Sequence, residues 1–76
     1  MPLSRKEQNR LRVLGANIRR ERCAKKVTQE DLAERTEIST RNLQKVEAGQ
    51  LNLLGTTLIR IQLALRSPWT KLMPKE

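Results

Sequence analysis

A nine-residue segment, 39–47, carries the side chains best suited to recognition chemistry. Its apolar residues Leu43 and Val46 fall on one side of a helix. Four residues off that side carry hydrogen-bonding groups: Thr40, Arg41, Gln44 and Lys45. Arginine and lysine can donate to guanine O6 and N7, glutamine can pair with adenine, and a threonine methyl can touch the methyl of thymine. The pattern predicts a helix whose outer face reads base pairs in a major groove.

The residue types of this chain do not indicate a catalytic or metal-binding site. The chain has no histidine, a single cysteine (Cys23) and no pair of carboxylates on a shared face. These residues supply no acid–base couple, metal cluster or glycine-rich phosphate loop. We therefore expect no enzyme activity, no metal and no cofactor, and we expect Cys23 to be an inert, half-buried thiol.

Positive charge is concentrated at the start of the chain. Sixteen Lys and Arg against eight Asp and Glu give a net charge of +8, and residues 1–26 hold nine basic and two acidic residues, a net +7. A domain with a sequence pI near 10.9 is expected to attract polyanions. The chain has no Phe, Tyr or His and a single Trp, so it cannot build the aromatic platforms on which RNA and single strands stack. Double-stranded DNA is the expected partner.

Apolar spacing and capping signals predict a single all-α domain over residues 1–76. It is a compact bundle of five helices, covering residues 4–25, 28–36, 39–47, 57–65 and 67–73. The two helices within residues 28–47 are joined by a tight turn, which is the layout of a helix-turn-helix. No apolar run approaches the roughly 18 residues that span a bilayer, so we expect a soluble, cytoplasmic protein.

Particular residues mark the helix ends. Ser4 and Glu7 are spaced to form a capping box at the first helix, and Gly49 suits the left-handed conformation that ends the third. At the fifth helix, Ser67 is expected to cap, with Pro68 at the first helical position.

Three segments resemble the lambda-repressor/Cro (Xre-type) helix-turn-helix family. They are Thr28–Ala33 (TQEDLA), Ser39–Gly49 (STRNLQKVEAG) and Thr57–Ile61 (TLIRI). The likeness can be placed without gaps from about Leu14 to Met73. The paired signature in the first two segments is much more specific than either half. The resemblance implies that the third helix lies in the major groove, since this family is a standard example of that docking geometry.

The resemblance also implies roles for individual residues. Thr40 and Arg41 are the leading base-reading positions, with Gln44 and Lys45 next. The implied contacts to the DNA backbone are Gln29, Ser39, Asn42 and Asn52. Arg22 and Glu47 both lie on inward helix faces by periodicity, and the corresponding positions pair in relatives, so we expect a salt bridge between them.

Members of the family commonly dimerise through their C-terminal helices. We therefore expect Trp69, Leu72 and Met73, in the helix at 67–73, to form part of a two-fold interface. The dimer would place two recognition helices roughly 34 Å apart, on a palindromic operator.

Some features depart from the family pattern. Lys26 stands where a turn glycine is common, and Gly55 takes a position that is usually apolar. The first helix also begins about ten residues early, and its basic residues have two possible roles: contacts to flanking phosphates, or solubility. They are Arg5, Lys6, Arg10 and Arg12.

Two readings of the function remain open. The first is a sequence-specific transcriptional regulator, of the phage Cro/repressor type or the restriction–modification controller type. The second is an antitoxin, or another interaction module whose main partner is a protein such as a toxin.

Overall fold

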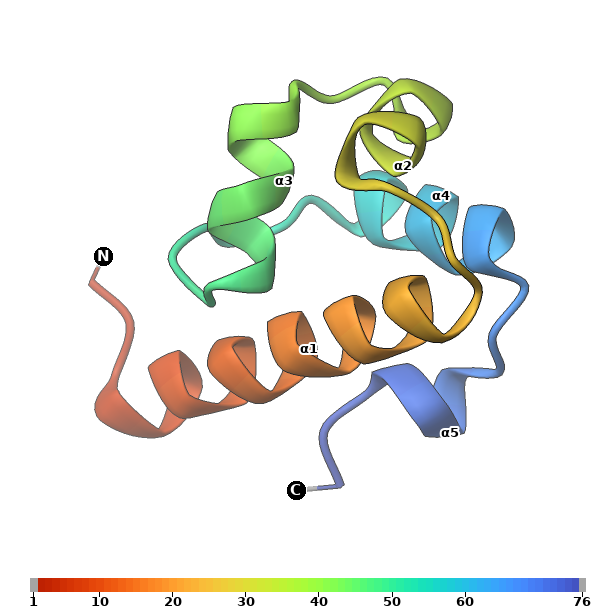
Figure 1. Ribbon diagram of the computed structural model, residues 1–76. Coiled ribbons are helices and arrows are strands. Elements are labelled where there is room, and N and C mark those ends of the chain that lie inside the picture. The colour runs from red at the N-terminus through yellow and green to blue at the C-terminus, as the bar shows by residue number, and fades with distance from the viewer. Residues whose placement is uncertain (1, 76) are drawn as a thin grey trace.

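The computed structural model describes residues 2–75 and contains five helices (Figure 1). They are α1 (Arg5–Ala24), α2 (Gln29–Thr36), α3 (Thr40–Glu47), α4 (Gly55–Leu65) and α5 (Trp69–Leu72). No strand occurs in these residues, and none of their helices is both long and apolar enough to cross a membrane. The all-α fold and the five-helix count predicted from the sequence are confirmed.

Side-chain caps begin the first three helices where the sequence predicts. At α1 the Ser4 hydroxyl accepts from the Glu7 N–H at 3.1 Å, and the Glu7 carboxylate accepts from the Ser4 N–H at 3.0 Å. Thr28 caps α2 and Ser39 caps α3, each accepting one backbone N–H from three residues ahead. These bonds satisfy N–H groups that a helix start would otherwise leave without a partner.

A residue with left-handed backbone conformation follows each of the first four helices, and the one after α4 is Arg66 (φ 54°). Lys26 (φ 58°) follows α1, Glu37 (φ 59°) follows α2 and Gly49 (φ 74°) follows α3. The glycine prediction at residue 49 is confirmed. At Lys26 the chain adopts the left-handed conformation that favours glycine, although the residue is a lysine.

Two expected helix starts are wrong. Helix α4 begins at Gly55, two residues before Thr57, and has no side-chain cap. Helix α5 begins at Trp69, so Pro68 is the residue before the helix, and no side chain caps it. Ser67 does not cap because its hydroxyl is buried, donating to Glu21 Oε1 at 2.9 Å and accepting from the Lys25 ammonium.

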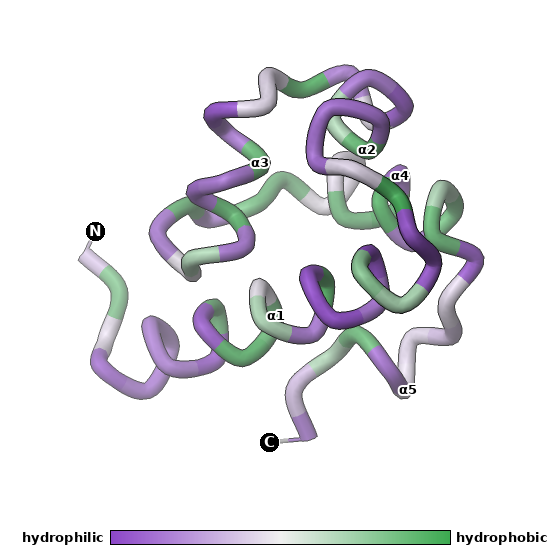
Figure 2. Tube along the Cα trace, in the orientation of Figure 1, coloured by the Kyte–Doolittle hydropathy of each residue, from purple (hydrophilic) through white to green (hydrophobic). Residues whose placement is uncertain are grey.

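The core lies where the five helices meet. Its fully buried large apolar residues come from every helix: Ile18, Leu32, Leu43, Ile61, Leu65 and Leu72. Figure 2 shows hydrophobic positions along much of α4 and mostly hydrophilic ones in the first turns of α1. Leu72 is 0% exposed, so its assignment to a dimer surface is wrong. Over a four-residue helix, periodicity could not tell the inward residue from its outward neighbours.

Helices α1 and α3 touch at a glycine. A Cβ at Gly15 would lie 2.2 Å from the Val46 carbonyl oxygen and 2.8 Å from that of Glu47. Any larger residue would push the two helices apart, because backbone atoms cannot yield as side chains do. The long first helix is therefore the support against which α3 is held.

Candidate nucleic-acid interface

Helix α3 presents a polar face at the edge of the molecule (Figure 1). Leu43 and Val46 are buried at 0% and 2% exposure, which holds one side of the helix against the core. On the outer side, Arg41, Gln44 and Lys45 are exposed, and Thr40 is partly buried. The four residues predicted to read bases therefore lie on one short helix whose orientation is set by its buried side.

The residues predicted to contact phosphates flank this face. Asn42 is exposed within α3, and Asn52 is exposed in the loop between α3 and α4. Ser39 is also exposed; its oxygen accepts the Asn42 N–H at 3.0 Å. The hydroxyl proton can still be donated. Gln29 is partly buried at the start of α2 and already has partners within the fold.

The predicted salt bridge between Arg22 and Glu47 is present. Arg22 Nε donates to Glu47 Oε2 at 2.6 Å, and Nη2 donates to Oε1 at 3.1 Å. Arg22 Nη1 also donates to the Val27 carbonyl at 2.9 Å. The two charged side chains are only 11% and 4% exposed. The hydrogen bonds to Glu47 are the main reason why the pKa of Arg22 lies above its usual value.

This ion pair affects the charge of the outer face of α3, the recognition face, which carries Thr40, Arg41, Gln44 and Lys45. Glu47 is the only acidic residue in α3, and its carboxylate is buried against a guanidinium rather than exposed beside Arg41 and Lys45. The outer face of α3 therefore carries two exposed cations and no exposed acid. Such a face attracts a polyanion without a local repulsive charge.

A chain of side chains continues from the ion pair to the recognition face, and sequence reasoning missed it. Gln29 Nε2 donates to Glu47 Oε1 at 3.0 Å, and Gln29 Oε1 accepts from Gln44 Nε2 at 3.4 Å. These contacts join α2 to α3, so no spacing within one helix could have revealed them. They restrict the rotamers of Gln44 before any ligand binds.

Several large apolar side chains lie outside the core and are exposed. Trp69 and Met73 are 39% and 41% exposed, as a surface role requires, and Ile59 and Leu63 on α4 are 50% and 65% exposed. The α4 pair escaped the sequence prediction, although a helix that is apolar all round often has a second face to bury. Cys23 is exposed, contrary to the expectation of a half-buried thiol.

The comparisons with known proteins identify the family. A helix-turn-helix family model matches residues 18–72, which is most of the chain. The chain belongs to the lambda-repressor/Cro-like (Xre-type) helix-turn-helix family. Its members are DNA-binding transcriptional regulators. Among curated proteins, none is similar enough to this helix-turn-helix chain to count as a match.

Two solved structures share the fold of this helix-turn-helix protein. The restriction–modification controller protein C.AhdI from Aeromonas hydrophila aligns with a TM-score of 0.78 and 28% identity, over 83% of this chain and 96% of that chain. The clp gene regulator ClgR from Corynebacterium glutamicum aligns with a TM-score of 0.78 and 28% identity, over 93% and 69% of the two chains. The family match begins at residue 18, well inside α1.

Proposed function

We propose that this protein is a sequence-specific regulator of transcription that binds a palindromic operator in duplex DNA as a homodimer. The observation that carries the proposal is the exposed cationic face of α3, held rigidly by its buried side and by the Arg22–Glu47 pair. A rigid helix with this face fits the major groove, which admits one α-helix.

The side chains of the proposed interface form two groups: those that contact base edges and those that contact the DNA backbone. Thr40 and Arg41, in the first turn of α3, are the main readers of base edges, and Gln44 and Lys45 lie one turn further along. The DNA backbone is contacted by Gln29, Ser39, Asn42 and Asn52. These contacts to the DNA backbone fix the register of α3 on the duplex and carry no sequence information.

The homodimer is built from the exposed apolar residues. Trp69 and Met73, together with Ile59 and Leu63, would be covered by the same surface of a second copy. An isologous contact of this kind has two-fold symmetry, which matches a palindrome. The two copies of α3 would then lie roughly 34 Å apart, one turn of DNA.

The similarity to C.AhdI supports a regulator of the controller type, because the alignment covers 96% of that protein. An antitoxin-like module is the second candidate, and it is favoured by the same exposed apolar residues of α4. The two candidates differ in what they require of DNA. An operator-binding regulator must distinguish sequences, whereas a module that works through a protein partner need not.

The test is selection of bound duplexes from a random pool. The wild-type protein should enrich one palindromic sequence, and the T40A/R41A/K45A variant should lose that preference while keeping its melting temperature. A charge-matched control, R35A/K75A, removes one Arg and one Lys from exposed positions outside α3 and should keep the preference. An unchanged preference in the triple variant would show that α3 does not read the operator.

A further inference from the structure

The first half of α1 lies outside the matched family region and next to the end of α3. Residues 5–17 of the helix precede the family match, which begins at 18. A Cβ at Gly49 would lie 2.5 Å from the Arg12 Cα, so the backbone of α1 at residue 12 touches the residue that ends the third helix. Residues 5–17, the extension of α1, are thereby fixed against the helix-turn-helix formed by α2 and α3.

A hollow of about 610 Å³ lies at this junction, and apolar residues (Leu3 and Leu11 among them) line it together with polar ones. Its polar lining residues are Gln8 and Arg12 from α1 and Gln50 and Asn52 from the loop after α3, and no acidic residue lines it. Arg12 is exposed, and its Nη1 donates to Asn9 Oδ1 at 3.1 Å. Because a guanidinium has five N–H donors, this bond orients Arg12 and leaves donors for a ligand.

We propose that Arg12, assisted by Gln8 and Gln50, binds the DNA backbone just beyond Asn52 and extends the footprint past the family's own recognition unit. The inference rests on the proposed function, since the occupant is a phosphodiester of the same duplex that α3 reads. Two observations select this occupant: the cation and the amide donors match an anion, and the hollow is continuous with Asn52, the predicted phosphate contact.

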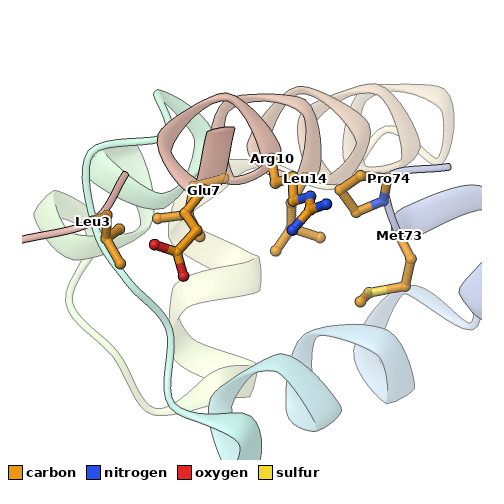
Figure 3. A pocket seen from close by; sticks show the side chains of 7 residues that line it. Leu3, Glu7, Arg10, Leu14, Met73 and Pro74 are labelled. Carbon is orange, nitrogen blue, oxygen red and sulfur yellow. The ribbon is translucent and has the colours of Figure 1, made fainter. Parts of the chain in front are cut away.

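Two other basic residues of the extension, Lys6 and Arg10, face elsewhere. Lys6 and Arg10 line a separate hollow with Pro74 and Lys75 of the C-terminal tail. Figure 3 shows Arg10 beside Pro74, with Met73 close by. Positions 10 and 12 are about 200° apart around a helix, so one side of α1 adjoins α3 and the other adjoins the tail. Lys6 therefore provides a control that removes the same charge from the same helix.

The experiment compares R12Q and K6Q with the wild-type protein on the selected duplex by fluorescence anisotropy across a salt series. Each phosphate contact contributes about 0.9 to the slope of log K against log salt. R12Q should lose about 0.9 in slope per bound protomer and bind about tenfold more weakly in moderate salt. Sequence discrimination should not change, because the contact is to the backbone. K6Q should keep the wild-type slope.

Phosphate ethylation interference locates the contact. The wild-type protein should be blocked by ethylation of flanking phosphates that R12Q tolerates, while both variants melt at the wild-type temperature. An unchanged salt slope in R12Q would overturn the inference. A loss of slope in K6Q equal to that in R12Q would also overturn it, because it would show that net charge, and not a contact at residue 12, accounts for the effect. If the wild-type protein showed no sequence preference, both the proposed function and this contact would be refuted. If it showed a preference but R12Q kept the wild-type salt slope, only this contact would be refuted.

Discussion

Replacing Glu47 with glutamine should destabilise the protein far more than the same change at an exposed acid. The substitution keeps the shape of the side chain and removes its charge, so the Arg22 guanidinium stays buried at 11% exposure without a counter-ion. It also weakens the acceptor that holds Gln29 at 3.0 Å. The loss therefore affects both the α1–α3 contact and the support of Gln44.

The magnitude follows from the burial of the pair. Removing one partner of a buried ion pair costs about 3–5 kcal/mol. In a domain of this size each kcal/mol lowers the melting temperature by about 4–8 °C, so Tm should fall by at least about 12 °C. Thermal unfolding followed by circular dichroism measures this change directly.

Glu37 provides the matched control. Its carboxylate lies 3.5 Å from Arg60 Nη1, but the two side chains are 73% and 49% exposed. Water screens such a pair, so E37Q should cost at most about 1 kcal/mol. In a double-mutant cycle with R22Q, the E47Q change should cost much less once the arginine is already gone. Equal melting temperatures for E47Q and E37Q would refute the argument that burial makes this pair structural.

Three further predictions concern packing, acidity and assembly. G15A should destabilise the fold by more than about 1–3 kcal/mol in urea titrations because its Cβ meets carbonyl oxygens, whereas G55A, with nothing within 4 Å, should stabilise it by up to about 1 kcal/mol; the reverse order would contradict this packing. The hydrogen bond from the Ser67 hydroxyl lowers the pKa of Glu21 below the usual 4.5. The stabilisation that the ionised Glu21 contributes is therefore fully present above pH 4.5 and is lost as the pH falls through the lowered pKa. In denaturation curves recorded from about pH 5 to 3, E21Q should lose less stability on acidification than the wild-type protein. Finally, L63E should sediment as a monomer with its melting unchanged, and a persistent dimer would exclude the α4 surface from assembly.

The sequence predicted best those features that depend on neighbours along the chain. The caps at Ser4, Thr28 and Ser39 and the left-handed turn at Gly49 are local, and the structure contains all four. The Arg22–Glu47 pair was also predicted: periodicity places both residues on inward helix faces, where an isolated charge would be costly, and the family resemblance implies that they pair.

The errors arose where distant residues decide the outcome. Ser67 has the sequence signature of a cap, but Glu21, 46 residues earlier, takes its hydroxyl. Gly55 has a low helix propensity, yet α4 begins there, because packing of the helix outweighs a local preference. The Gln29–Gln44 contact joins residues from different helices, and single-helix periodicity contains no information about it.

The continuity of α1 has an energetic consequence for how such a protein can acquire new contacts. Its 20 residues form one unbroken helix that is partly inside and partly outside the matched domain. A flexible arm must be ordered each time it binds, at a cost of about 1–2 kcal/mol for each residue whose backbone is fixed. Turns added to the end of a helix already packed in the fold are ordered before any encounter. Lengthening α1 thus enlarges the available surface without the entropic penalty that an appended tail would incur.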